Sequence, residues 1–393
     1  MIFDEKGNAL GHGYKEYPSE SPYAGWGEQS LEKVWDGICV ASKQATSQAN
    51  LPDDAYVSVG FSSQRGTLCL LDKDKKPLQD SILWYCTRAR DYPEIFGQHI
   101  TPEEYQEHTG MQLSPLWVAA KIAWLRDNKP DTFEKTAWFA NGQEYFLYLL
   151  GADRWETDPA SLTLNGMMDI RKLDWSDRVL EMCGISRDRV PPVGPPSGMV
   201  GKVSKQASEA TGIPEGVILC RGAGDQQCAA IGAGVIRQGM AEFTVGTAGV
   251  MVAHLDSVDR IKGKNLWWGG HGVPNAWDIE GGAFCLGASL KWWRDNLGLD
   301  EVQEAESRNT SPYSVMVDKA QESPAGARGL LFHSFLASQV TPYYDADSRG
   351  GLIGLGNYHT RVDLVRALLE GCAHEMKMAV SYTHLTLPTR CRG

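Results

Sequence analysis

The sequence has no apolar run that could cross a membrane, because the roughly 20 consecutive apolar residues that a spanning helix needs occur nowhere in it. It also lacks an excess of positive charge, since 38 Lys and Arg stand against 49 Asp and Glu, a net charge of −11. Nucleic-acid and membrane-surface proteins depend on Lys and Arg contacts, so we expect neither partner. The opening MIFDEKGNALGHGY is not a secretory signal peptide either.

Cysteine and histidine are present but form no metal-binding pattern. The 9 cysteines are scattered, odd in number and never spaced CxxC, and the 9 histidines form no HxxxH, HExxH or His/Cys cluster. These absences argue against a disulfide framework and a transition-metal site, and they predict reduced thiols in a cytoplasmic protein. The sequence also has no GxSxG elbow of a serine hydrolase and no GxxxxGK[ST] phosphate loop.

What is present is an ordinary globular composition over 393 residues, with 42% hydrophobic and 22% charged residues. This length predicts two domains. Strand and helix patterns mix in both halves, which favours an α/β fold with a cleft between the domains, and the pattern restarts near 235–240. We expect a hairpin in residues 1–10, strands at 55–61, 67–71, 81–84, 217–220, 241–245 and 250–255, helices at 31–41, 116–128, 144–150, 175–183 and 226–234, and an ordered proline-rich connector at 190–196.

The segment GAGDQQ, residues 222–227, places two glycines and a carboxylate where a predicted strand turns into a helix. Asp225 is either the cap of that helix or a general base, because α/β proteins bind ligands at the carboxyl ends of strands. A weak base suffices for phosphoryl transfer, in which positioning and electrostatics dominate. The sequence leaves both interpretations open.

Two further polar features have both a plain and a functional interpretation. The turn in TVGTAGV, residues 244–250, is either an ordinary β-hairpin or a phosphate-binding turn of backbone N–H groups and a threonine hydroxyl. Gln64, Arg65 and residues 84–88 follow two predicted strands. They are either surface polar residues beside a packed tryptophan or one wall of a site for a polyhydroxylated ligand.

Several segments together resemble the FGGY family of carbohydrate kinases. KIAWLRDN, residues 121–128, resembles its first signature, although Val118 stands where the pattern has Pro, Ser or Thr. Residues 350–370, GGLIGLGNYHTRVDLVRALLE, match its second signature throughout, with Thr360 and Asp363 placed as a capping box. GAGDQQCAAIGAG and FTVGTAGV resemble its catalytic and phosphate segments, and the resemblance covers residues 1–380.

The resemblance implies two ribonuclease-H-like domains of the actin/hexokinase type, a sugar-binding domain at 1–236 and a nucleotide-binding domain at 237–380. It implies ATP with Mg²⁺ as phosphoryl donor, a small sugar or polyol as acceptor, and a homodimer by analogy. The implied site residues are Asp225 as the base, Gln64, Arg65, Trp84 and Gln226 on the substrate, and Gly246, Thr247, Gly287 and Lys291 on the nucleotide.

The substrate loops point in two directions. Gln64-Arg65 and WYCTR, residues 84–88, resemble the NQRET and W-x-C-x-R segments of glycerol kinases, but Gly66 stands where those enzymes have a substrate-binding Glu. Xylulokinases usually carry Q-M-H-G and W-N-D-x-R, and this chain lacks that His and that Asp. The GAGDQQCAAIGAG segment and the length pattern favour a ketopentose such as xylulose, with a glycerol-type polyol as the alternative.

Two family segments have no counterpart here, the opening D-x-G-T-T-x-x-K strand and turn and a later G-G-G-x-x-S adenine segment. We therefore expect a chain truncated at both ends, with an incomplete second domain, a non-native tail at 381–393 and impaired activity. The missing strand predicts an exposed sheet edge and poor solubility. A non-enzymatic sugar-binding module is the alternative, whereas the signatures disfavour a chaperone or an acetate-kinase relative.

Overall fold

The computed structural model describes residues 1–260, 266–283, 285–336, 339, 341, 343, 345 and 348–382. The chain divides into two compact units, the first comprising Met1–Gly232 and Trp268–Trp277 and the second Ala233–Trp267 and Asp278–Gly393. The domain ranges expected from the sequence differ from these two units and remain a prediction. The predicted tail overlaps the last helix at residues 381–382, and its remainder lies outside the described residues.

The first unit mixes helices with short strands. Its helices are α1 (Leu31–Ala49), α2 (Tyr92–Gly97), α3 (Pro102–Thr109), α4 (Val118–Asn128), α5 (Pro130–Lys135), α6 (Gly142–Leu150), α7 (Pro159–Leu162), α8 (Asp177–Cys183), α9 (Lys205–Thr211) and α10 (Asp225–Gly232). Its strands are β1 (Ile2–Phe3), β2 (Ala9–Gly11), β3 (Glu28–Gln29), β4 (Ser58–Val59), β5 (Ser62–Ser63), β6 (Cys69–Leu71), β7 (Ser81–Ile82), β8 (Trp138–Ala140), β9 (Met168–Asp169), β10 (Asp174–Trp175), β11 (Met199–Lys202), β12 (Ile218–Cys220) and β13 (Ala223–Gly224).

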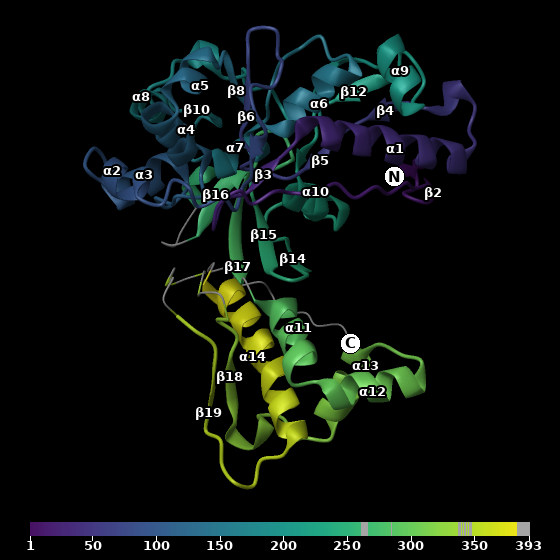
Figure 1. Cartoon of the computed structure of the whole chain (residues 1–393), viewed down its shortest axis with the longest axis vertical. Helices are drawn as coiled ribbons and strands as arrows, with labels where there is room; N and C mark the ends of the chain where they lie inside the picture. Colours follow the sequence, from purple (N-terminus) through teal and green to yellow (C-terminus); the bar gives the residue numbers. More distant parts are fainter. Residues whose placement is uncertain are drawn as a thin grey trace. The chain divides into compact units, whose positions relative to one another are not determined.

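After residue 232 the chain forms six further strands and four further α-helices among the described residues. The strands are β14 (Ala241–Val245), β15 (Gly249–Leu255), β16 (Trp267–Gly270), β17 (Trp277–Ala283), β18 (Leu331–His333) and β19 (Gly351–Ile353), and the helices are α11 (Leu286–Asn296), α12 (Leu299–Arg308), α13 (Pro312–Gln321) and α14 (Arg361–Tyr382). Strands β14, β15, β17 and β16 form one sheet in that order, and β18 pairs with β19 (Figure 1). This mixture of helices and strands in both units agrees with the α/β class that the sequence predicts.

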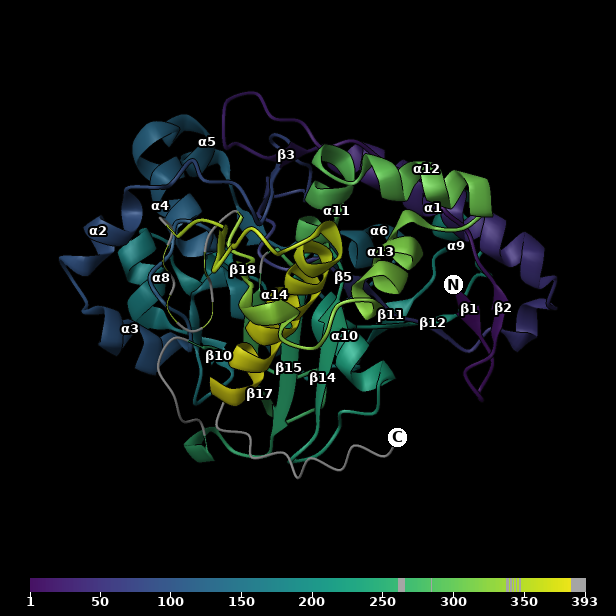
Figure 2. The same ribbon diagram turned by 90° about the horizontal axis from the view of Figure 1, so that it is seen from below.

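The N-terminal hairpin is confirmed, because β1 pairs antiparallel with β2. Figure 2 shows both strands beside α1. The chain after β2 follows this helix, since the His12 and Tyr14 backbone N–H groups donate to the side chains of Gln48 and Gln44, at 2.8 Å each. Helix α1 begins at Leu31, as the helical spacing of its apolar residues predicts, and Ser30 is its N-cap.

The single strand expected over 55–61 is wrong. A 3₁₀ turn at Asp53–Ala55 comes first, and then two short strands, β4 and β5, follow with a break between them. β4 pairs parallel with β12 and β5 pairs parallel with β13. The partner strands β12 and β13 are separated at Arg221-Gly222. Their separation divides residues 55–61 and the residues that follow into two strands, although the unbroken apolar run predicts one.

The helices expected at 116–128, 144–150, 175–183 and 226–234 exist, with shifted ends. Helix α8 begins later because the Ser176 hydroxyl accepts the Val179 N–H at 3.2 Å and so fixes the N-cap. The proline-rich connector is ordered, as predicted, and is held by hydrogen bonds. The Trp175 indole donates to the Pro191 carbonyl at 2.7 Å, and the Arg221 guanidinium donates to the Pro195 carbonyl at 2.9 Å.

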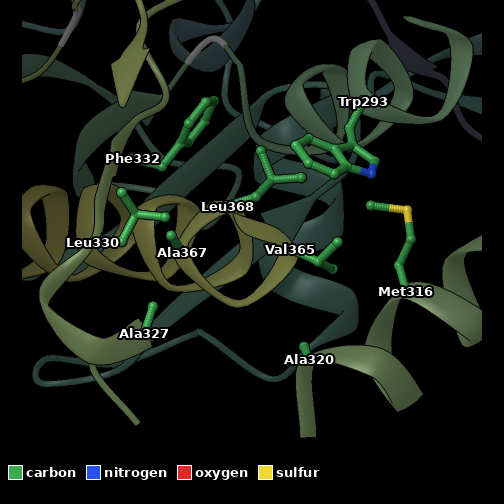
Figure 3. Packing of buried hydrophobic residues seen from close by; sticks show 9 residues of the cluster. All are labelled: Trp293, Met316, Ala320, Ala327, Leu330, Phe332, Val365, Ala367 and Leu368. Carbon is green, nitrogen blue, oxygen red and sulfur yellow. The ribbon is translucent and has the colours of Figure 1, made fainter. Parts of the chain in front are cut away.

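The second unit has a hydrophobic core around α14, which lies beside α11 and β18 (Figures 1 and 3). Helices α11, α13 and α14 and the segment that leads into and includes β18 contribute its buried members, which are Trp293, Met316, Ala320, Ala327, Leu330, Phe332, Val365, Ala367 and Leu368. The second FGGY-like signature therefore supplies strand β19 and the core-facing turns of α14.

One half of the predicted capping box is present at the start of α14. The Asp363 carboxylate accepts the Thr360 backbone N–H at 2.8 Å and the Ser323 hydroxyl at 2.7 Å. These hydrogen bonds, with Arg328 beside them, lower the pKa of Asp363 to about 2. The carboxylate is therefore charged at neutral pH and holds the helix terminus to the segment after α13.

Replacing Leu368 by Ala tests the importance of this core. Leu368 is fully buried, so Leu368→Ala should lower the free energy of unfolding by about 2–5 kcal/mol, through lost burial and the cavity left behind. The matched control is Leu355→Ala at a leucine 64% exposed, for which we expect a change within about 0.5 kcal/mol. Urea unfolding followed by circular dichroism measures both, and equal effects would contradict this view of the core.

Candidate active site

The candidate site in the first unit is built where two parallel strands end. Strands β5 and β13 pair in register, with Ser62 opposite Ala223 and Ser63 opposite Gly224. The chains approach so closely that a Cβ on Gly222 would lie 1.5 Å from the Phe61 carbonyl oxygen. Residues that follow these strands therefore leave the same edge together, which is where ligands bind in α/β proteins.

Asp225 follows β13 directly and is the first residue of α10. Its carboxylate is exposed and accepts the Gln226 backbone N–H at 3.0 Å. Beside it, the side-chain oxygen Oε1 of Gln226 is buried with no hydrogen-bond partner among the described residues. The exposed Asp225 carboxylate is suited to a ligand that offers hydroxyl donors.

Gln64 and Arg65 follow β5 and so lie at the same edge. The Gln64 side chain is exposed and donates to the Gln29 side chain at 3.3 Å. Arg65 is buried, and its side chain packs against Gly224, where a Cβ would lie 2.3 Å from the Arg65 Cδ. The structure thus brings four predicted residues together, two from each strand end.

Trp84 joins this group through the backbone. Its side chain is 45% exposed, which leaves much of its face open to a ligand. A Cβ on Gly66 would lie 3.4 Å from the Trp84 Cβ, so the loop after Arg65 runs against the loop that carries Trp84. The predicted base and the four residues predicted to contact the substrate therefore belong to one region of the first unit.

The four residues predicted for the nucleotide belong to the second unit. Gly246 and Thr247 form the exposed turn between β14 and β15, as predicted. The start of α11 lies against this turn, because the Gly287 N–H donates to the Gly246 carbonyl and the Ala288 N–H donates to the Thr247 carbonyl, at 3.0 Å each. Gly246, Thr247 and Gly287 thus lie together, where the turn meets the start of α11.

Gly287 has a structural explanation. A Cβ there would lie 2.3 Å from the Gly246 carbonyl oxygen, so only glycine lets α11 approach the turn. Lys291 lies one helical turn further on, is 62% exposed and pairs with Asp295. A tight glycine turn with an exposed Thr hydroxyl fits phosphate oxygens, so these residues are compatible with ATP.

Sequence reasoning placed Lys121 in a family signature and Arg88 in a candidate site wall, but it did not predict that they support the Trp84 loop. Lys121 of α4 is fully buried and donates to backbone carbonyls in both loops. The buried Arg88 pairs with Glu28 at 2.6 Å. One sequence feature could have indicated the role of Lys121. It is a lysine in the middle of the apolar stretch VAAKIAWL, where a helix position that faces solvent is not expected. Among the described residues, no group of three or more His, Cys, Asp or Glu could hold a metal ion.

Comparison with known proteins places the chain in a family. The model of the "FGGY family of carbohydrate kinases, N-terminal domain" matches residues 1–232, and that of the C-terminal domain matches residues 241–382. The chain belongs to the FGGY family of carbohydrate kinases. These enzymes are phosphotransferases with an alcohol group as acceptor. The prediction of truncation at both ends is not borne out by these matches.

Its relatives differ in substrate. A glycerol kinase of Thermococcus onnurineus is 29% identical over 95% of this chain and 73% of its own length. A xylulose kinase of Bacillus subtilis is 27% identical over 97% and 74%, and a gluconokinase of the same organism is 26% identical over 100% and 74%. The FGGY relationship is therefore secure, while these identities leave the substrate open.

Solved FGGY kinases share the fold. A ligand-bound xylulose kinase from Lactobacillus acidophilus superposes with a TM-score of 0.83 at 23% identity, over 94% of this chain and 72% of that one. A Plasmodium falciparum glycerol kinase with ADP gives 0.81 at 21%, over 95% and 74%. The predicted actin/hexokinase-type fold of two α/β domains is confirmed. No described helix is long and apolar enough to span a membrane.

The contact between α11 and the 246–247 turn generates a prediction for this FGGY kinase. Gly287→Ala forces a methyl group onto the Gly246 carbonyl, so we expect a loss of about 1–3 kcal/mol in stability. Gly246→Ala is the control, because a Cβ there meets only the Ala248 carbonyl oxygen, at 3.7 Å. Melting temperatures of both variants test this, and a Gly287→Ala variant as stable as Gly246→Ala would refute it.

Proposed function

We propose that this chain transfers the γ-phosphoryl group of ATP to a hydroxyl of a small sugar, a ketopentose such as xylulose, with Asp225 accepting the hydroxyl proton. The observation that carries the proposal is the parallel pairing of β5 with β13, which gathers Gln64, Arg65, Asp225 and Gln226 at one strand edge. A carboxylate and an unused amide acceptor beside amide and guanidinium donors suit a ligand with several hydroxyl groups.

In this proposal, Asp225 orients the reacting hydroxyl and takes its proton as the oxygen attacks phosphorus. Gln226 accepts a hydrogen bond from a second hydroxyl, Gln64 and Arg65 donate to the remaining oxygens, and the Trp84 face packs on the carbon chain. The proton would move from the hydroxyl to the Asp225 carboxylate, and the new bond would join the sugar oxygen to the γ-phosphorus. The bond from that phosphorus to the oxygen bridging the β- and γ-phosphates would break, so that ADP leaves. Because Asp225 is exposed at the start of a helix, the carboxylate is accessible to the hydroxyl that it serves.

ATP and Mg²⁺ are proposed as the donor pair. Bound ATP supplies the phosphoryl group, and Mg²⁺ neutralises charge on the phosphate oxygens. The turn at Gly246 and Thr247 would hold phosphate oxygens through its exposed Thr hydroxyl and backbone, while Gly287 keeps α11 against the turn. Lys291 lies on the same helix and pairs with Asp295, and in this proposal it exchanges that partner for the nucleotide.

The ketopentose is favoured over glycerol at Gly66. By resemblance, glycerol kinases carry a substrate-binding Glu there, whereas here the backbone has a φ of +68° and a Cβ would lie 3.2 Å from the Leu164 Cβ. A carboxylate contact to a small triol is thus missing and sterically disfavoured. The Gln64-Arg65 pair and the 29% identity to a glycerol kinase favour a glycerol-type polyol as the second candidate.

Three lesser assignments complete the proposal. We propose domains at 1–236 and 237–380, a homodimer by analogy with the family, and a cytoplasmic location because the cysteines lack any disulfide or metal-site spacing. The eight cysteines that the structure describes carry free thiols.

A substitution at Asp225 tests its role as base. Asp225→Asn keeps the size of the side chain but cannot take a proton, so kcat should fall by about 10²–10⁴-fold while the sugar KM changes within about threefold. Asp131→Asn is the control, because Asp131 is likewise exposed in the first turn of a helix, α5. A coupled ADP-release assay measures both, and an Asp225→Asn variant that keeps wild-type kcat rules out this mechanism.

A substrate panel decides among the proposed functions. Purified chain is assayed for ATP turnover with xylulose, ribulose, glycerol and gluconate. We expect the highest kcat/KM with a ketopentose; a preference for glycerol establishes the polyol alternative. Melting-temperature shifts with a sugar, without turnover of any substrate, would instead establish a sugar-binding module, since ligand binding to the folded state raises stability by mass action.

A further inference from the structure

One face of α4 supports the loop that carries Trp84. Lys121 and Trp124 are spaced i, i+3 on this helix and so project from neighbouring positions on one face. Lys121 is fully buried, in a helix whose neighbouring residues are nearly all apolar. Burying an ammonium group is costly unless it is fully hydrogen-bonded, so its partners indicate what it does.

The partners of Lys121 are three backbone carbonyls. Its Nζ donates to Gly66 at 3.0 Å, to Leu83 at 2.9 Å and to Trp84 at 3.2 Å. An ammonium has three N–H donors, so these contacts use all of them. One side chain thereby joins the loop after β5 to the loop after β7, the two loops that carry Arg65 and Trp84.

These carbonyls lie just beyond the point where direct pairing of the two chains ends. Leu68 and Ile82 exchange two backbone hydrogen bonds, of 2.8 and 2.9 Å. Beyond that pair, the Gly66 and Leu83 carbonyls accept hydrogen bonds from the Lys121 ammonium group. Lys121 thus replaces the missing continuation of the ladder at the position where the substrate-facing residues begin.

Trp124 acts on the far end of the same loop. The Arg88 guanidinium lies 4.0 Å from the Trp26 ring centroid and 5.4 Å from that of Trp124. It also pairs with Glu28. Cation–π contacts of a desolvated Arg hold its position more firmly than exposed ones. The loop from Leu83 to Arg88 is thus held by α4 at both ends.

We propose that Lys121 is a positioning residue for the sugar site, which holds the backbone of the 64–66 and 83–88 loops so that Arg65 and Trp84 face the substrate. Trp124 assists it through Arg88. This inference rests on the proposed function for the identity of the ligand, but its structural part concerns only the order of the two loops. It also gives the K-x-x-W of the first signature a physical meaning, since each residue holds one end of the loop.

Lys121→Met tests this role. Methionine fills a similar volume without an N–H group, so the loops lose their shared donor. A misplacement of about 1 Å can cost on the order of 10²-fold in rate, so we expect the sugar KM to rise about tenfold or more and the ATP KM to stay within about twofold. The control is Lys129→Met, because Lys129 is exposed at the C-terminal end of the same helix.

Hydrogen exchange tests the structural part without substrate. The Leu83 N–H donates to the Gly27 carbonyl at 3.0 Å and the Thr87 N–H to the Gly25 carbonyl at 2.8 Å. In Lys121→Met these amides should exchange faster than in wild type, while amides of α14 in the other unit keep their rates. If the variant does not fold, Trp124→Leu is measured instead, with faster exchange expected at Thr87. Unchanged exchange in residues 81–88 overturns the proposal.

The pH dependence of the sugar KM gives a second readout. Burial lowers the pKa of Lys121 to about 7, with the Cys86 thiol opposing this shift and the Arg88 guanidinium adding to it. Below that pH the ammonium supplies three N–H donors, and above it the amine supplies only two. The wild-type KM should therefore rise as pH increases from 6 to 9. Lys121→Arg, which keeps its charge throughout, should show no such rise; an identical rise contradicts the inference.

The two proposals fail in different ways. Wild-type chain that phosphorylates none of the panel overturns the proposed function, and the exchange experiment still decides whether Lys121 orders the loops. Conversely, turnover with equal effects of Lys121→Met on the sugar and ATP KM supports the kinase function and overturns the positioning role, because a general loss of structure does not discriminate between the two substrates.

Discussion

The first unit depends on the close approach of two chain segments that are far apart in the sequence. β5 and β13 pair in parallel, and the approach is possible because Gly222 has no Cβ to collide with the Phe61 carbonyl. Everything proposed for the sugar follows from this contact: Gln64 and Arg65 leave one strand, and Asp225 and Gln226 leave the other. A bulkier residue at position 222 would separate the strands and disperse four site residues at once.

The second unit also depends on a close approach, here between the start of α11 and the turn that joins β14 to β15. The turn at Gly246 and Thr247 is fixed by the start of α11, whose first N–H groups donate to its carbonyls. Helix α11 is in turn fixed by α14, since the Cys372 thiol lies 3.6 Å from the Leu286 carbonyl and Trp293 is buried in the α14 core. The long C-terminal helix is thus connected to the exposed turn by contacts that are largely apolar and independent of any ligand. Burial of that kind stabilises without requiring precise charge placement.

The sequence predicts much of the fold but less of the site. The hairpin β14–β15, helix α1 and the cap of α14 follow from local patterns, namely a glycine turn, a 3.6-residue period and the Thr360–Asp363 spacing. The prediction of one strand over 55–61 was wrong because pairing with β12 and β13, near residue 220, divides this part of the chain into β4 and β5. Likewise Lys121 is visible in the sequence as a charge in an apolar stretch and as part of the first signature, but its three acceptors are backbone carbonyls, which no side-chain pattern reveals.

Support through backbone carbonyls has a consequence for specificity. Lys121 holds Gly66, Leu83 and Trp84 by their main-chain oxygens, so the side chains of both loops can change without disturbing the support. The relatives of this chain are named for glycerol, xylulose and gluconate, which differ in length and in charge. A scaffold that fixes the path of the chain and leaves side-chain identity free can accommodate such a range. In this chain Gly66 is the exception, since its φ of +68° favours glycine, lets the loop turn between Arg65 and the buried Thr67, and leaves no carboxylate at the proposed sugar site.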